Sequence, residues 1–317
     1  MGTKSAFTFP ERFWLVEEPP HTQTFFQLSE VFAEVGAWET RPGLRIAACK
    51  GGAFVFDFAK IQGALAENDP TGSLHFSRLI GATQERVKLI NSFALCLHSA
   101  RIEKEEFASD GYRIDHRSLF HLNNDDVSSG LGGPGLMTLQ PVPGLGFARD
   151  PYRMGAVPKA SISAACELLD HLMASTFKKA LELTVLINDS LASLKNHDFA
   201  SSLITSWTVC ETLLQHHWTQ YFTTTGTSKN SARRQKLLGR DFTASVVSEI
   251  LELAGVLDGE ILHKLDTARR ARNSWMHSIK PPSYEDSIAA LELSSEMLGN
   301  VVGRRVRVAP SVFAAVF

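Results

Sequence analysis

The feature that most constrains the fold is a long series of helical patterns in the second half of the chain. From Ala160 almost to the C-terminus, apolar residues recur three and four positions apart, and no stretch alternates as a strand would. The expected helical regions are 161–194, 199–222, 233–257, about 260–278 and 283–302. Because short polar turns such as Asp258-Gly259 connect them without intervening strands, these regions predict an antiparallel helical bundle.

The first half carries a β-hairpin signal. Large apolar or small apolar residues recur at every second position on both sides of the turn Lys50-Gly51-Gly52. They are Leu44, Ile46 and Ala48 before the turn, and Phe54, Phe56 and Phe58 after it. A stripe of phenylalanines can stack on nucleic-acid bases, but it is more often one side of a hydrophobic core. We expect a core.

Helical patterns also occur in the first half. Residues 22–36 have helix-like spacing, and a turn at 69–73 precedes a long amphipathic helix. Arg86 and Arg101 lie off the apolar stripe of that helix, so we expect them on a solvated face. The extended stretch 112–122 is rich in His and Arg, but its spacing does not favour a metal site.

The type of element changes near Pro158. The sequence therefore predicts an α+β protein that is mainly α. Residues 1–157 form a mixed α/β domain that senses a signal or recruits a substrate, 158–305 form the helical bundle, and 306–317 form a C-terminal tail.

Composition excludes several classes of protein. A hydrophobic content of 44% with 21% charged residues is typical of a globular chain, and a formal charge of −2 gives no global nucleic-acid signal. No apolar run or leader sequence is evident, which favours a cytoplasmic protein without a membrane anchor. The four distant cysteines indicate reduced thiols, and the absence of a glycine-rich phosphate loop predicts no cofactor.

The candidate site is the stretch 265–280, LDTARRARNSWMHSIK. It combines three arginines with His277, and Pro281-Pro282 ends the helix behind it. A basic helix end that carries a histidine can hold a phosphodiester and move a proton. Arg272 falls on the apolar stripe, where an arginine requires a carboxylate or a phosphate. Glu211, on the helix expected to face this one, is the natural acidic candidate.

With WTVCETLLQHHW at 207–218 and RARNSWMH at 270–277, residues 160–305 resemble a HEPN domain. That family has an Arg, a polar residue and a His after four to six intervening positions. Arg272, Asn273 and His277 match this motif. Glu211 corresponds to the polar or acidic residue that many members carry on the first helix of the bundle.

The resemblance implies a metal-independent endoribonuclease that acts as a homodimer in a toxin, antiviral-defence or RNA-processing role. His277 would act as general acid or base, Arg272 would hold the phosphate, and Asn273 would orient the phosphate or the histidine. The cations expected to bind RNA are Arg269, Arg270 and Lys280. No metal is implied.

Two alternatives stay open. Some HEPN-like proteins are non-catalytic and serve as RNA-binding or assembly modules. An antitoxin or an activating partner also stays open, although Ile279 stands where some toxins carry the Tyr that an antitoxin modifies.

Helix geometry constrains the site. Residues five positions apart, such as Arg272 and His277, point about 140° apart on a regular helix. Either the last turn unwinds before Pro281, or two chains share one cleft.

Overall fold

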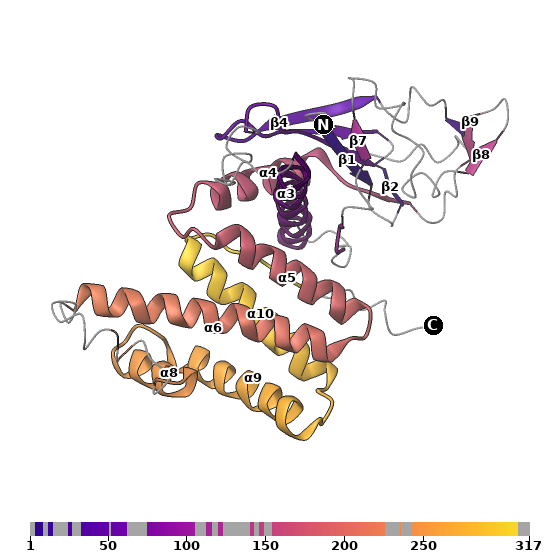
Figure 1. Cartoon of the computed structure of the whole chain (residues 1–317). Coiled ribbons are helices and arrows are strands. Elements are labelled where there is room, and N and C mark those ends of the chain that lie inside the picture. The colour runs from indigo at the N-terminus through magenta and orange to yellow at the C-terminus, as the bar shows by residue number, and fades with distance from the viewer. Residues whose placement is uncertain are drawn as a thin grey trace. The chain divides into compact units, whose positions relative to one another are not determined.

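The computed structural model describes residues 4–8, 12–14, 25–26, 33–50, 52–61, 75–104, 112–115, 120–122, 140–142, 146–148, 154–225, 235, 237 and 242–309. Over these residues the chain is mixed α and β and mainly helical (Figure 1). It divides into two compact units, Met1–Leu181 and Glu182–Phe317.

The first unit contains an antiparallel five-stranded sheet with the order β4-β5-β6-β1-β7. These strands are β1 (Lys4–Thr8), β4 (Glu34–Glu39), β5 (Arg45–Cys49), β6 (Ala53–Asp57) and β7 (Phe120–Leu122). The hairpin predicted around Gly51 is confirmed as the β5–β6 pair, in which Ile46 faces Phe56.

Short strands form two smaller sheets in this unit. One pairs β2 (Arg12–Trp14) with β10 (Met154–Ala156) in parallel. The other has the order β3-β9-β8, and its strands are β3 (Phe25–Phe26), β8 (Gln140–Val142) and β9 (Gly146–Ala148).

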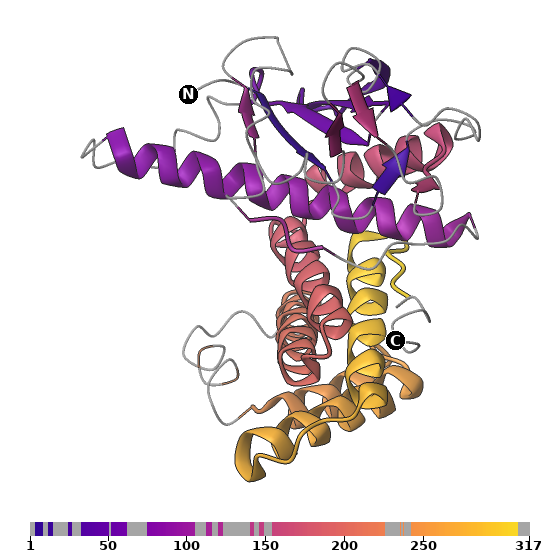
Figure 2. The ribbon, with the colours of Figure 1, turned by 90° about the vertical axis from the view of Figure 1, so that its right-hand side faces the viewer.

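The phenylalanine stripe is the core of the first unit, as expected. Phe54, Phe56 and Phe58 are fully buried, and α3 (His75–Glu103) packs on Phe54 and Phe56 through Phe93. The ring centroid of Phe93 lies 5.1 Å from that of Phe54 and 5.4 Å from that of Phe56, both in edge-on geometry. Figure 2 shows α3 running along one face of the sheet.

Two arginines of α3 contradict the expected solvated face. Arg86 is 0% exposed and Arg101 is 3% exposed. The guanidinium of Arg86 lies 5.1 Å from the ring centroid of Phe58, and its Nη1 donates to Ser5 Oγ at 3.3 Å. Burial lowers the pKa of Arg86. The prediction failed because α3 packs against both the sheet and α4 (Lys159–Met173), so more than one face of the helix is covered.

The helix expected at 22–36 is also wrong where the structure describes it. Phe25–Phe26 is strand β3, and Glu34–Glu39 is edge strand β4, whose Trp38 pairs with Ile46. Pairing with β5 supplies backbone hydrogen bonds that the helical spacing of the apolar residues does not reveal.

The helical region predicted at 161–194 is two helices, α4 and α5 (Ala180–Lys195). Ser175 Oγ accepts a hydrogen bond from the backbone N of Phe177 at 3.2 Å, a local turn that competes with helix continuation. Because α4 packs on α3 and β4, the compact units divide at Leu181/Glu182, whereas we expected a boundary at 157/158.

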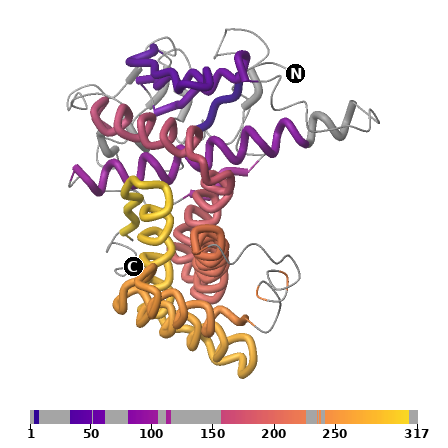
Figure 3. Tube along the Cα trace, turned by 90° about the vertical axis from the view of Figure 1, so that its left-hand side faces the viewer, coloured from indigo at the N-terminus to yellow at the C-terminus, as the bar shows by residue number. Residues whose placement is uncertain are grey.

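The second unit consists of packed helices. They are α5, α6 (Phe199–Thr224), α8 (Ala244–Leu253), α9 (Gly259–Ser278) and α10 (Tyr284–Val302), and the predicted region 233–257 is described only in part. Figures 1 and 3 show α6 between α5 and the α8–α9 pair. Ser190 of α5 joins the buried Ser202 and Ser206 of α6 through hydroxyl contacts of 2.9 and 2.7 Å. Ser287 of α10 donates to the carbonyl of Phe199 at 3.0 Å.

No helix in the described part of the chain is long and apolar enough to cross a membrane. The four cysteines form no disulfide with one another, as expected, and all four are buried. Burial raises the pKa of Cys49 to about 11 and that of Cys166 to about 12, so these thiols stay protonated at neutral pH.

The aromatic contact between α3 and the sheet gives a stability prediction. Phe93→Ala should destabilise the first unit by about 3–5 kcal/mol, because it leaves a cavity against Phe54 and Phe56. Hydrogen exchange of peptides from β5 and β6 in increasing urea measures this change. The exposed control Leu253→Ala should stay within about 0.5 kcal/mol. Equal protection in both variants would contradict the assigned core.

Candidate active site

Helix α9 carries the candidate residues, and only its first half is anchored. Its N-terminus is capped by Asp258, whose carboxylate accepts from the backbone N of Ile261 at 2.7 Å. The buried residues Ile261, Leu265 and Ala268 lie on one stripe that faces the neighbouring helices. Beyond Ala268 every residue of the helix is half-buried or exposed.

The C-terminal end of α9 is a tight turn. Ile279 closes the helix in the left-handed conformation (φ 52°, ψ 26°), and its backbone N donates to the Trp275 carbonyl at 2.9 Å. Pro281 and Pro282 follow, and α10 then begins with a capping box between Ser283 and Asp286. The turn therefore brings the last residues of α9 close to the first turn of α10.

Arg272 is half-buried, so our expectation of a buried charge is wrong. Its Nη1 donates to Asn273 Oδ1 at 2.9 Å, which pairs two residues of the motif. Glu211 is exposed, and in the described part of the second unit no ion pair joins it to Arg272. The half-buried position follows from the anchoring of α9, which stops one turn before Arg272.

His277 is exposed on the last turn of α9. The helix is regular through Ser278, so the last turn does not unwind ahead of the prolines. His277 and Arg272 therefore project about 140° apart on this chain. Next to His277, Met276 is 51% exposed and Ile279 is 76% exposed.

The other two arginines share one carboxylate. Arg269 Nη2 donates to Asp266 Oδ1 at 2.6 Å, and Arg270 pairs with the second oxygen of the same group. The hydrogen bond from Arg269, followed by that from Arg270, lowers the pKa of Asp266. Two cations on one anion leave a net positive charge on this turn of the helix.

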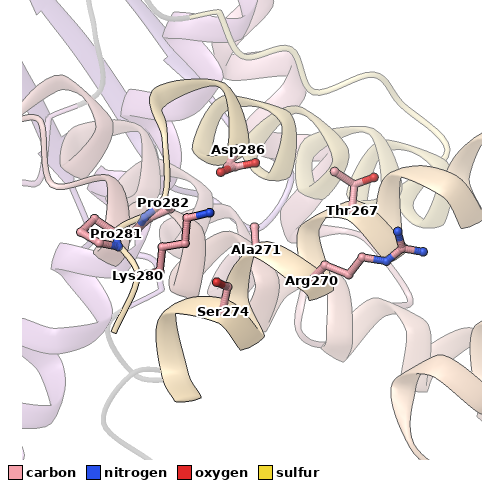
Figure 4. A pocket seen from close by; sticks show the side chains of 8 residues that line it. All are labelled: Thr267, Arg270, Ala271, Ser274, Lys280, Pro281, Pro282 and Asp286. Atoms are coloured by element: carbon pink, nitrogen blue, oxygen red, sulfur yellow. The ribbon is translucent and has the colours of Figure 1, made fainter. Parts of the chain in front are cut away.

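A hollow of about 240 Å³ opens beside these cations (Figure 4). Its lining residues are Thr267, Arg270, Ala271, Ser274, Lys280, Pro281, Pro282 and Asp286. It brings together Arg270 and Lys280, two of the three cations predicted to bind RNA. Arg272, Asn273 and His277 do not line it.

Sequence reasoning missed Thr267, Ala271, Ser274 and Asp286 as parts of a site. A signal was present, because small side chains at 267, 271 and 274 share one helix face just before the Pro-Pro turn. Such a face leaves space when the chain folds back beside it. The spacing gives no such signal for Asp286, because its position beside the hollow depends on the path of the turn between α9 and α10.

Among the described residues, no group of three or more His, Cys, Asp or Glu side chains could hold a metal ion. No protein-family model, curated protein or solved structure matches this chain. Any assignment of function therefore depends on the residues themselves.

The left-handed residue at the end of α9 gives a second prediction. A β-branched residue is strained in this conformation, whereas glycine is not. Ile279→Gly should therefore raise the free energy of unfolding of the second unit by about 1 kcal/mol in urea titrations. Ile279→Ala keeps a Cβ atom and should gain less. A loss of stability in Ile279→Gly would argue against the left-handed cap.

Proposed function

We propose that the helices of the second unit form an antiparallel HEPN-like bundle and that the protein is a metal-independent endoribonuclease. The observation that carries this proposal is the end of α9. Arg272, paired with Asn273 at 2.9 Å, and the exposed His277 have the order and spacing of the family motif. Their position beyond the anchored half of the helix leaves them accessible to a large substrate.

The chemistry follows from these side chains. An imidazole can remove the proton from a ribose 2′-OH, and the 2′-oxygen then attacks the adjacent phosphorus. The bond from phosphorus to the 5′-oxygen breaks, and a protonated imidazole supplies the proton for this leaving oxygen. The guanidinium of Arg272 binds the phosphate and neutralises the charge that develops in the transition state. Asn273, which accepts a hydrogen bond from this guanidinium, fixes the orientation of the guanidinium. The products are a 2′,3′-cyclic phosphate and a 5′-hydroxyl.

A homodimer reconciles this chemistry with the geometry of α9. On one chain Arg272 and His277 point about 140° apart, so they do not converge on one phosphate. Two chains that meet at their α9 ends bring the Arg272 of one protomer near the His277 of its partner, and two copies of His277 supply both a base and an acid. The exposed Met276 and Ile279 beside His277 give such an interface an apolar component.

The same proposal gives the first unit a role. The first unit recruits the substrate or senses a signal, and the protein acts in the cytoplasm as a toxin, a defence nuclease or an RNA-processing enzyme. An antitoxin or an activating partner would then control it. The exposed cations Arg270 and Lys280 also fit a second candidate function, RNA binding without cleavage.

The first test of this proposal is the loss of His277. His277→Ala should reduce RNA cleavage about a hundred- to ten-thousandfold, or roughly 3 to 5 kcal/mol of barrier, without loss of folding. Cleavage of total RNA and tRNA is measured in EDTA, and the new ends are identified as 2′,3′-cyclic phosphates. The matched control is His263→Ala, because His263 is also exposed and lies fourteen positions earlier, on nearly the same side of α9.

A companion variant tests the role of Arg272. Arg272→Lys keeps the charge but loses the two-pronged donor, so it should also be strongly impaired while staying folded. Wild-type cleavage by His277→Ala, or a requirement for a divalent ion, would favour the non-catalytic function.

A further prediction concerns assembly. The protein should sediment as a dimer, and its activity per chain should fall on dilution. Met276→Asp should shift this loss to higher protein concentrations, because it introduces a charge into the apolar patch beside His277. Leu253→Asp, at an exposed apolar position on α8, is the control and should not shift it. A strictly monomeric protein with full activity would rule out the shared cleft.

A further inference from the structure

The hollow between α9 and the α9–α10 turn has a charge pattern that suggests a ligand. Figure 4 shows Arg270 and Lys280 at opposite ends of the hollow, with Ala271 between them. Asp286 lies on the α10 side, at the end near Lys280. The hollow is thus positive at both ends and carries one carboxylate.

Its size limits what it holds. A volume of about 240 Å³ is smaller than the roughly 300–1,000 Å³ of pockets that enclose a cofactor or a drug-sized ligand. The small side chains of Ala271 and Ser274 let a ligand approach the helix backbone closely. A single sugar fits this space better than a complete dinucleotide.

The polar groups have distinct roles toward such a ligand. Asp286 Oδ2 accepts from the backbone N of Ser283 at 3.1 Å, which fixes the carboxylate through one of its two oxygens beside the hollow. A carboxylate repels a phosphate but accepts a hydrogen bond from a hydroxyl. The cations at the two ends attract phosphates, and Asp266 neutralises only one of the two arginines that it contacts.

We infer that this hollow binds one ribose of a single-stranded RNA together with the phosphates on both of its sides. Lys280 and Arg270 each contact one phosphate, and Asp286 accepts the ribose 2′-OH, the group that distinguishes RNA from DNA. This inference rests on the proposed function, since it names a binding site for the same substrate outside the reacting residues. The subsite positions the strand along α9 while Arg272 and His277 act on another phosphate.

The test measures binding to the full-length chain with His277→Ala, so that cleavage does not remove the ligand. Fluorescence anisotropy gives the affinity for a short uridine oligoribonucleotide as a function of salt concentration. Arg270→Gln and Lys280→Gln should each weaken binding about tenfold. Each should also reduce the slope of log affinity against log salt by about 0.7, as expected for one lost phosphate contact. The matched control is Lys264→Gln, because Lys264 lies on α9 outside the hollow.

A steric variant separates the hollow from general electrostatic attraction. Ala271→Leu keeps every charge but fills part of the hollow with a larger side chain. It should therefore weaken binding as much as the charge variants do. Ala289→Leu, at an exposed position on α10, is its control. Asp286→Asn keeps the helix cap but should reduce the preference for the oligoribonucleotide over the matching oligodeoxyribonucleotide.

Several outcomes overturn the inference. They are an equal loss of affinity in Lys264→Gln, unaltered binding in Ala271→Leu, and competition by uridine monophosphate as effective as that by the oligonucleotide. Failure of the subsite and failure of the nuclease proposal give different results. If the His277-intact chain leaves RNA whole while the hollow variants lose affinity, the subsite stands and the nuclease fails. If cleavage proceeds and its KM is unchanged in the hollow variants, the nuclease stands and the subsite fails.

Discussion

The organisation of the candidate site depends on how α9 ends. Proline cannot extend a helix, so Pro281 and Pro282 force the chain to turn, and the left-handed Ile279 makes that turn within one residue. The helix therefore stays regular through Ser278, and the first turn of α10 lies close to the end of α9. The divergence of Arg272 and His277 and the hollow with Arg270 and Lys280 both follow from this one turn.

The two halves of α9 differ in what stabilises them. Ile261, Leu265 and Ala268 bury the first half, and Asp258 caps it. The second half contributes half-buried polar residues and ends in the exposed Met276 and His277. Polar side chains on an anchored helix can present chemistry to a ligand without the cost of full burial. This division places Arg272 and His277 on the part of the helix that lies beyond its buried stripe.

The core of the first unit shows how a charged residue is accommodated where sequence reasoning places it in solvent. Arg86 is fully buried with its guanidinium over Phe58 and a hydrogen bond to Ser5. Its delocalised charge is more weakly hydrated than an ammonium group and stacks on an aromatic face. The cost of burial is visible in the lowered pKa of Arg86, whose largest cause is desolvation.

Local sequence patterns determined the β5–β6 hairpin, the long helix α3, the capped start of α10 and the helical character of the second unit. Each depends on the spacing of neighbouring residues, on turn residues such as Gly52 or on a cap such as Ser283. The Arg272-Asn273-His277 motif was visible for the same reason. Only the tertiary structure decided that residues 34–39 form an edge strand, that Arg86 is buried and that Arg272 is half-buried and not paired with Glu211. It also decided that Asp286 and Lys280 line the same hollow, near one end of it. These outcomes depend on contacts between segments distant in sequence or on the path of a turn, which the periodicity of a single segment does not encode.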